Sequence, residues 1–150
     1  LAAAPEIDFW TGNKVYERLP ADRHAFAAGA QRIAKGLGEK LERMAAASEW
    51  LPGIAAVETA GHTPGHVSFA FRSAGQEVMV LGDALTHPRI SFAHPEWRPA
   101  SDHDAERAVA TRRSLLDRLH QEGVLAIGYH LPGAAGRVER DAAAYRFVPV

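Results

Sequence analysis

The sequence predicts a mixed α/β fold that forms a single domain over residues 1–150. Two segments with the apolar period of a helix alternate with short runs of β-branched and apolar residues bounded by Gly or Pro. One helical segment lies between two such runs, as in a βαβ unit. With 150 residues, of which 47% are hydrophobic and 23% charged, the chain is long enough for one sizeable core.

Composition excludes several classes of function. A net charge of -1 and a pI near 6.8 give no basic surface for nucleic acid or for an anionic membrane. No apolar run reaches the roughly 18 residues that span a bilayer. The compartment is left open, with the cytoplasm favoured. Because there is no cysteine, any metal must be held by His, Asp or Glu. The start at Leu1 rather than Met suggests a piece of a longer chain.

The first organised segment, residues 21–50, has apolar residues at helical spacing. We expect one helix or a broken pair there, with a kink or join at Gly36 or Gly38, since each costs about 1 kcal/mol relative to Ala. Core or interface packing explains the stripe better than a ligand site. The stripe consists of Phe26, Ala30, Ile33, Leu37, Leu41 and Met44.

Short strands are expected from residue 54 onward, together with a second amphipathic helix over 103–122 that ends at Gly123. The expected strands cover residues 54–60, 67–71, 77–82, 124–128, 136–140 and 145–149.

The strands 67–71 and 77–82 are joined by a turn centred on Ala74-Gly75, which predicts an antiparallel hairpin. If Ser73 opposes Gln76, the same register places His66 opposite Asp83. Directly opposed side chains have Cβ atoms about 5 Å apart, so these two could share a metal ion. A slip of one residue would break this pairing.

The helix 103–122 joins the strands 77–82 and 124–128 as a crossover, which predicts that the two strands are parallel. Asp83 follows the first and His130 follows the second, so both should reach the sheet edge where His66 lies. Each residue alone is explained by a turn, a cap or a solvated side chain. Three together favour a metal site, since imidazole and carboxylate suit zinc and related divalent ions.

Three motifs then carry a resemblance. The stretches "GHTPGH", "VLGDALTH" and "GYHLPGAAGRVERDAAAYRFVPV" resemble the C-terminal half of metallo-β-lactamase-fold hydrolases, from about Asp8 onward. "ISFAHPEWRPASDHD" resembles the branch of methyl parathion hydrolases and lactonases. The resemblance implies an αβ/βα sandwich and a centre of two divalent ions, with zinc favoured. His66 would bind one ion, Asp83 would bridge both as the catalytic carboxylate, and His130 would bind the other.

The chain departs from the family in two places. The His-x-His-x-Asp-His motif that supplies the family's other ligands is absent from these residues. We therefore expect an incomplete or empty site, weak metal binding and little activity in this chain alone. We also expect an apolar sheet face that needs a cover, provided by an N-terminal fragment or by a second copy. "LPGAAG" lacks the branch's usual aromatic and second proline, which leaves substrate preference open.

Other polar residues receive simpler assignments. His62 and Thr63 belong to the loop that presents His66, with His62 bracing it, and His87 either faces the pocket or lies on the surface. Ser101 and Asp104 have the spacing of a helix capping box. The neighbouring Arg112 and Arg113 are expected on a solvated helix face, and His24, His94, His103 and His120 on the surface or in packing.

Three functions remain open. The first is a binuclear metallohydrolase, as the parent protein, in which a metal-bound hydroxide attacks a lactone, phosphotriester or similar ester. The second is a non-catalytic remnant or interaction module with an incomplete metal site. The third is a thioester hydrolase of the glyoxalase type, which would use the same ligands. The partner in the enzymatic cases is a small-molecule ester or lactone, without nucleic acid or membrane.

Overall fold

A seven-stranded sheet organises the molecule in the computed structural model, which describes residues 1–150. Its strands follow one another in sequence order, and all neighbours are antiparallel except β6 and β7. A separate two-stranded pair joins β1 to β2 near the N-terminus. The strands are β1 (Ala2–Ala3), β2 (Arg43–Met44), β3 (Ser48–Leu51), β4 (Ile54–Glu58), β5 (Val67–Ser73), β6 (Gln76–Val80), β7 (Leu125–Ile127), β8 (Ala135–Asp141) and β9 (Ala144–Pro149).

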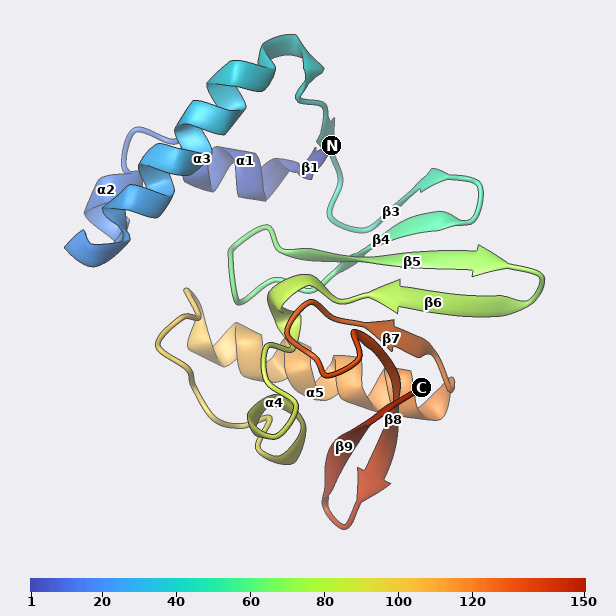
Figure 1. Ribbon diagram of the computed structural model, residues 1–150. Coiled ribbons are helices and arrows are strands. Elements are labelled where there is room, and N and C mark those ends of the chain that lie inside the picture. Colours follow the sequence, from blue (N-terminus) through green and yellow to red (C-terminus); the bar gives the residue numbers. More distant parts are fainter.

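The helices form two groups. Three lie together near the N-terminus, apart from the sheet, whereas the long α5 runs along the sheet with the short α4 beside it (Figure 1). None of the helices has the length and apolar character needed to cross a bilayer. The helices are α1 (Ala4–Thr11), α2 (Val15–Arg18), α3 (His24–Leu37), α4 (Ile90–Ala93) and α5 (Ala105–Gln121).

The predicted hairpin and its register are confirmed. Ser73 pairs with Gln76, and the ladder continues in the same register to Phe69 and Val80. The turn residues Ala74 and Gly75 have φ values of 49° and 75°, as a type I′ turn requires. If the same register is extended beyond the last pair, Phe69 and Val80, it places His66 beside Asp83.

The predicted βαβ unit is also confirmed. β6 and β7 are parallel, with Val80 paired to Ile127, and α5 connects them. α5 begins at Ala105 and is capped by Asp104, whose carboxylate accepts the backbone N–H of Arg107, so Ser101 is not the cap. The buried leucines of α5 pack on one face of the sheet and form the main core together with Phe92 of α4.

The other face of the sheet is apolar and partly open. Because side chains alternate along a strand, the neighbours of the buried Ala70, Met79 and Ala126 point away from α5. Two of them are exposed by more than a third, Phe71 at 41% and Val80 at 36%. The residues on this open face are Ile54, Ala56, Val67, Phe69, Phe71, Val78, Val80, Leu125 and Ile127.

The segment 21–50 agrees with its prediction in part: the helix breaks at Gly38 as expected, but strands rather than a second helix follow. The helix α3 ends at Leu37, because Gly38 adopts a positive φ of 51° and the chain continues into β2. Most of the predicted stripe is not core within this chain, since Phe26 and Ile33 are 70% and 64% exposed, although Met44 is buried. The strands β1, β2 and β3 and the helices α1, α2 and α4 lie outside the predicted set of elements.

Candidate metal centre

His66 lies beside Asp83 at the end of the β5–β6 hairpin, where the register places it. The backbone N–H of Asp83 donates to His66 Nε2 over 2.9 Å. The ring therefore faces the main chain of Asp83 rather than its carboxylate. Gly82 makes this approach possible, because a Cβ there would lie 2.6 Å from Nε2, and its φ of 58° also favours glycine.

A buried chain of hydrogen bonds fixes the tautomer of His66. The Ser68 hydroxyl donates to the Leu81 carbonyl, so Ser68 Oγ is left to accept from Thr59. Thr59 Oγ1 then accepts from His66 Nδ1 over 2.8 Å. With Nδ1 as donor and Nε2 as acceptor of the Asp83 N–H, the ring is neutral. Burial lowers the pKa of His66, and the nearby His62 lowers it further.

Thr59 is a residue that the sequence analysis missed. Glu58 pairs with Val67 across β4 and β5, and the next pair outward in that register is Thr59 and His66, whose backbone groups bond over 3.1 Å. The hairpin register of β4 and β5 would therefore have placed Thr59 opposite His66.

His130 reaches Asp83 from the other side. It follows β7 in the loop before β8, and its Nε2 lies 3.2 Å from Asp83 Oδ1. Both side chains are more than 40% exposed, His130 at 42% and Asp83 at 45%. The predicted convergence of these two residues at the sheet edge is therefore present in the structure.

His62 also faces Asp83, which the sequence analysis expected only to brace the loop. Its Nε2 lies 3.6 Å from Asp83 Oδ2, and its Nδ1 lies 3.1 Å from Asp102 Oδ1. Behind Asp102, Arg112 Nη1 donates to Oδ2 over 2.7 Å. The prediction that Arg112 is solvated is wrong, since it is 5% exposed, whereas its neighbour Arg113 is exposed.

The hydrogen-bond partners of Asp102 stabilise its ionised carboxylate. Burial alone would raise the pKa of this carboxyl, but hydrogen bonds from His62 and Arg112 outweigh it and leave the pKa below its ordinary value. Asp102 was missed because the polar residues of its stretch, "SDHD", were assigned a role only at Ser101 and Asp104, as a helix cap, and at His103.

The remaining predicted residues, Thr63 and His87, lie at different places. Thr63 lines the same cavity as His62, and its buried Oγ1 has no hydrogen-bond partner. His87 is exposed, and its Nδ1 accepts the backbone N–H groups of Arg89 and Ile90 at the start of α4. In the structure, His87 therefore stabilises the start of α4 and does not line the cavity.

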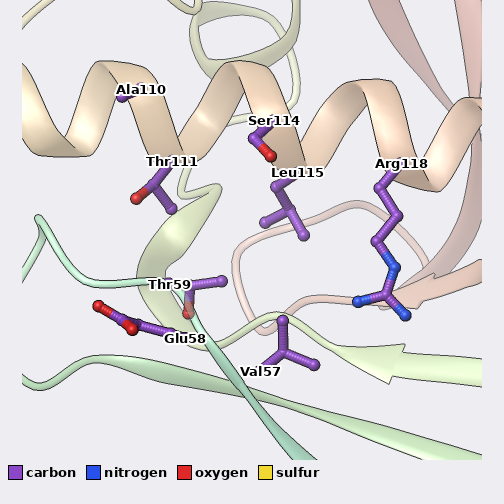
Figure 2. A pocket seen from close by; sticks show the side chains of 8 residues that line it. All are labelled: Val57, Glu58, Thr59, Ala110, Thr111, Ser114, Leu115 and Arg118. Atoms are coloured by element: carbon purple, nitrogen blue, oxygen red, sulfur yellow. The ribbon is translucent and has the colours of Figure 1, made fainter. Parts of the chain in front are cut away.

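A cavity of about 540 Å³ is lined by His62, His66 and Asp83, but not by His130. The N-terminal part of the chain adds apolar and charged side chains to its lining, namely Trp10, Phe26, Glu6 and Arg23. A second cavity, of about 270 Å³, lies between β4 and α5 and is lined by Val57, Glu58, Thr59, Ala110, Thr111, Ser114, Leu115 and Arg118 (Figure 2). It contains no histidine, so the chemistry favours the first cavity.

Imidazole nitrogens and a carboxylate are ligand types that suit a divalent metal ion. Two ligands of one tetrahedral zinc ion, at about 2.1 Å each, are about 3.4 Å apart. The separations from Asp83 to His130 and to His62, 3.2 and 3.6 Å, lie on either side of that value. His66 has the tautomer that a ligand with Nε2 as its donor atom requires. No group of three or more His, Cys, Asp or Glu side chains is arranged so that it could hold an ion.

Comparison with known proteins points to one fold. No protein-family model and no curated protein matches the chain. Among solved structures, the hydrolase AbOPH of the beta lactamase superfamily matches with a TM-score of 0.86 at 24% identity, over 99% of this chain and 54% of its own. AidC, a dizinc quorum-quenching lactonase in complex with a product, N-hexanoyl-L-homoserine, matches with the same TM-score and identity over 99% and 53%.

A third match is more distant. An N-acyl homoserine lactone hydrolase, with a product bound at its catalytic metal centre, has a TM-score of 0.59 at 17% identity, over 85% of this chain and 44% of its own. The chain thus spans about half the length of the structures it matches. These similarities establish the architecture: the chain has the mixed α/β fold of the metallo-β-lactamase superfamily.

Proposed function

We propose that this chain is the C-terminal part of a metal-dependent hydrolase that cleaves a lactone, phosphotriester or similar ester. One observation carries the proposal: the Asp83 carboxylate lies between imidazole nitrogens of His130 and His62, at 3.2 and 3.6 Å, on a fold shared with dizinc enzymes. Three elements distant in sequence supply these side chains, so a turn or a cap does not account for their meeting.

The proposed ligands are His66, Asp83 and His130, with Asp83 shared between two divalent ions. His66 would exchange the N–H of Asp83 for an ion while Thr59 continues to hold its Nδ1. Three ligands divided between two ions leave each ion short of protein donors. We therefore propose that this chain alone binds zinc weakly and that further ligands come from outside it.

Two divalent ions at this place would polarise the bond under attack and lower the pKa of a bound water. The chain itself contributes orientation. His130 Nε2 lies 3.2 Å from Asp83 Oδ1 and His62 Nε2 lies 3.6 Å from Oδ2, so the carboxylate has an imidazole on each of two sides. Trp10 and Phe26, which line the same cavity, favour a small substrate with an apolar part.

The open face of the sheet supports the need for a partner. It presents Phe71 and Val80 beside other apolar side chains, and an apolar patch of this kind is rare on a stable monomer. We propose that an N-terminal fragment of the same protein covers this face, with a second copy as the alternative.

The test uses the protein extended by its N-terminal half, with Asp83→Ala as the variant. The proposal predicts that metal-dependent turnover of lactone and phosphotriester substrates falls at least 1,000-fold, about 4 kcal/mol of transition-state stabilisation. Activity that survives in Asp83→Ala would exclude the proposed site. Adding thioesters to the substrate panel separates the glyoxalase-type alternative.

A non-catalytic remnant is the second candidate, and the lack of any three-ligand cluster favours it. Metal analysis of the purified 150-residue chain tests this candidate. Two zinc ions held stoichiometrically per chain would contradict it, whereas no zinc even in the extended protein would support it.

A further inference from the structure

In its neutral form, His62 presents a lone pair, not a proton, towards Asp83. Its Nδ1 is 3.1 Å from Asp102 Oδ1, and a carboxylate can only accept, so Nδ1 carries the ring proton. In the neutral ring this leaves Nε2 as an acceptor that faces the Asp83 carboxylate at 3.6 Å. Two acceptors that face one another at this distance are arranged for a positive group between them.

The partner of Asp102 explains why that tautomer is held. Arg112 donates three hydrogen bonds into the loop before α5, to Asp102 Oδ2 over 2.7 Å and to the carbonyls of Pro95 and Trp97 over 3.2 and 2.5 Å. Arg112 is 5% exposed, and the side chain of Asp102 is 4% exposed. A guanidinium has no acceptor atom, so it always requires an oxygen from residue 102.

The main chain completes the connection. The N–H groups of His103 and Asp104 donate to the carbonyls of His62 and Gly61, over 3.1 and 3.0 Å. The loop that Arg112 holds therefore also fixes the backbone from which the His62 ring projects. The ring has one bonded nitrogen, Nδ1, and one nitrogen directed towards Asp83.

We infer that Arg112 sets, through Asp102, the tautomer of His62, and that Arg112 and Asp102 are positioning residues of the candidate metal centre. The consequence for metal binding rests on the proposed function. The tautomer itself does not, because it follows from the contacts of this chain alone.

The substitution Asp102→Asn tests the inference. Arg112 still requires an oxygen, so it takes the carbonyl of the new side chain and turns the NH₂ group towards His62. His62 Nδ1 must then accept, and the ring proton moves to Nε2, where it faces Asp83. Arg113→Gln is the matched control, since Arg113 is the next residue on the same helix and is exposed.

The tautomer is measured in the ¹⁵N-labelled 150-residue chain by long-range ¹H–¹⁵N spectra of the imidazole rings at pH 8.5, well above the ordinary imidazole pKa of about 6.5. The expected result is the Nδ1–H form of His62 in wild type and in Arg113→Gln, and the Nε2–H form in Asp102→Asn. An Nε2–H form of His62 in wild type overturns the inference. This measurement on wild type remains a valid test even if Asp102→Asn does not fold.

Zinc affinity is measured on the same samples by competition with a chromophoric chelator. In Asp102→Asn the Nε2–H of His62 faces the Asp83 carboxylate and competes with the ion for it, so binding should weaken 10- to 100-fold, while Arg113→Gln should leave it unchanged. If wild type binds zinc and Asp102→Asn binds it equally well, the inference fails while the proposed function stands. If wild type has the Nδ1–H form but binds no zinc even when extended by its N-terminal half, the proposed function fails instead, and the assignment of the tautomer to Arg112 and Asp102 stands.

Discussion

The two histidines on either side of Asp83 are held in different ways. His66 belongs to the sheet edge, and both of its ring nitrogens have buried or backbone partners. His130 projects from a loop, is 42% exposed and contacts Asp83 as its one ionic partner. A side chain held by strand register has a fixed position, whereas a side chain on a loop can change position. Perturbations on the His66 side should therefore cost more folding stability than equivalent ones on the His130 side.

The largest difference is expected between two glycines. A Cβ at Gly61, before His62, would lie 2.4 Å from backbone atoms of Ala108 in α5, and its φ of 136° is unfavourable for other residues. We expect Gly61→Ala to lower the free energy of unfolding by about 3 kcal/mol or more.

Gly133→Ala is the matched change in the loop of His130. Its Cβ would meet Pro149 at an ordinary 3.5 Å, so only its φ of 71° adds cost, about 1 kcal/mol. Urea denaturation of both variants measures the difference. Equal losses in the two variants would show that the two sides are held alike.

A smaller difference is expected between two threonines. Thr59→Val removes the acceptor of the buried His66 Nδ1–H and should cost about 1–3 kcal/mol. Thr63→Val removes a buried hydroxyl that has no partner, so it should be neutral or stabilising. Chemical denaturation at pH 8 compares them, and a Thr63→Val loss as large as that of Thr59→Val would contradict the hydrogen-bond chain.

The neutral state of His66 predicts a pH dependence of folding. Burial holds its folded pKa below the value of 6.5 for a free imidazole, so the unfolded chain takes up a proton first as the pH falls. The stability that comes from neutral His66 is present above pH 6.5 and is lost as the pH falls through the folded pKa.

His66→Gln should reduce the slope of unfolding free energy against pH between 8 and 5, as measured by urea midpoints. Part of the slope should remain, because burial also lowers the pKa of His103, and His103→Gln provides the comparison. If His66→Gln has the same slope of unfolding free energy against pH as wild type, then His66 is not the group whose protonation causes the pH dependence.

The smallest effect on stability is expected at His130. Its exposed ring makes no buried contact that folding depends on, so His130→Ala should change the free energy of unfolding by less than about 0.5 kcal/mol. The same variant should lose zinc affinity, as measured by chelator competition. A large loss of stability would show that the His130 loop is as fixed as the sheet edge.

Sequence reasoning was most successful where local rules set long-range geometry. The turn at Ala74-Gly75 determines the register that brings His66 to Asp83, and the crossover helix determines the parallel pairing that brings His130 there. Period-2 and period-3.6 patterns gave the strands and α5 because each element buries one face.

The rest depended on packing that no local pattern contains. Arg112 follows a threonine and precedes an exposed arginine on an amphipathic helix, and only the fold of the loop 94–104 buries it. The stripe on α3 has the pattern of a core helix, yet Phe26 and Ile33 are exposed because no element of this chain packs over them. A periodicity shows which face is apolar, not whether a neighbour is present.

The most direct test of the account follows each histidine during addition of Zn²⁺ to the 150-residue chain. Imidazole ¹H–¹⁵N spectra should show shifts at His66 and His130, and these should disappear in Asp83→Ala, while His24, His94 and His120 stay unchanged. Shifts confined to the latter three histidines, or an unaltered response in Asp83→Ala, would contradict a metal centre built around Asp83.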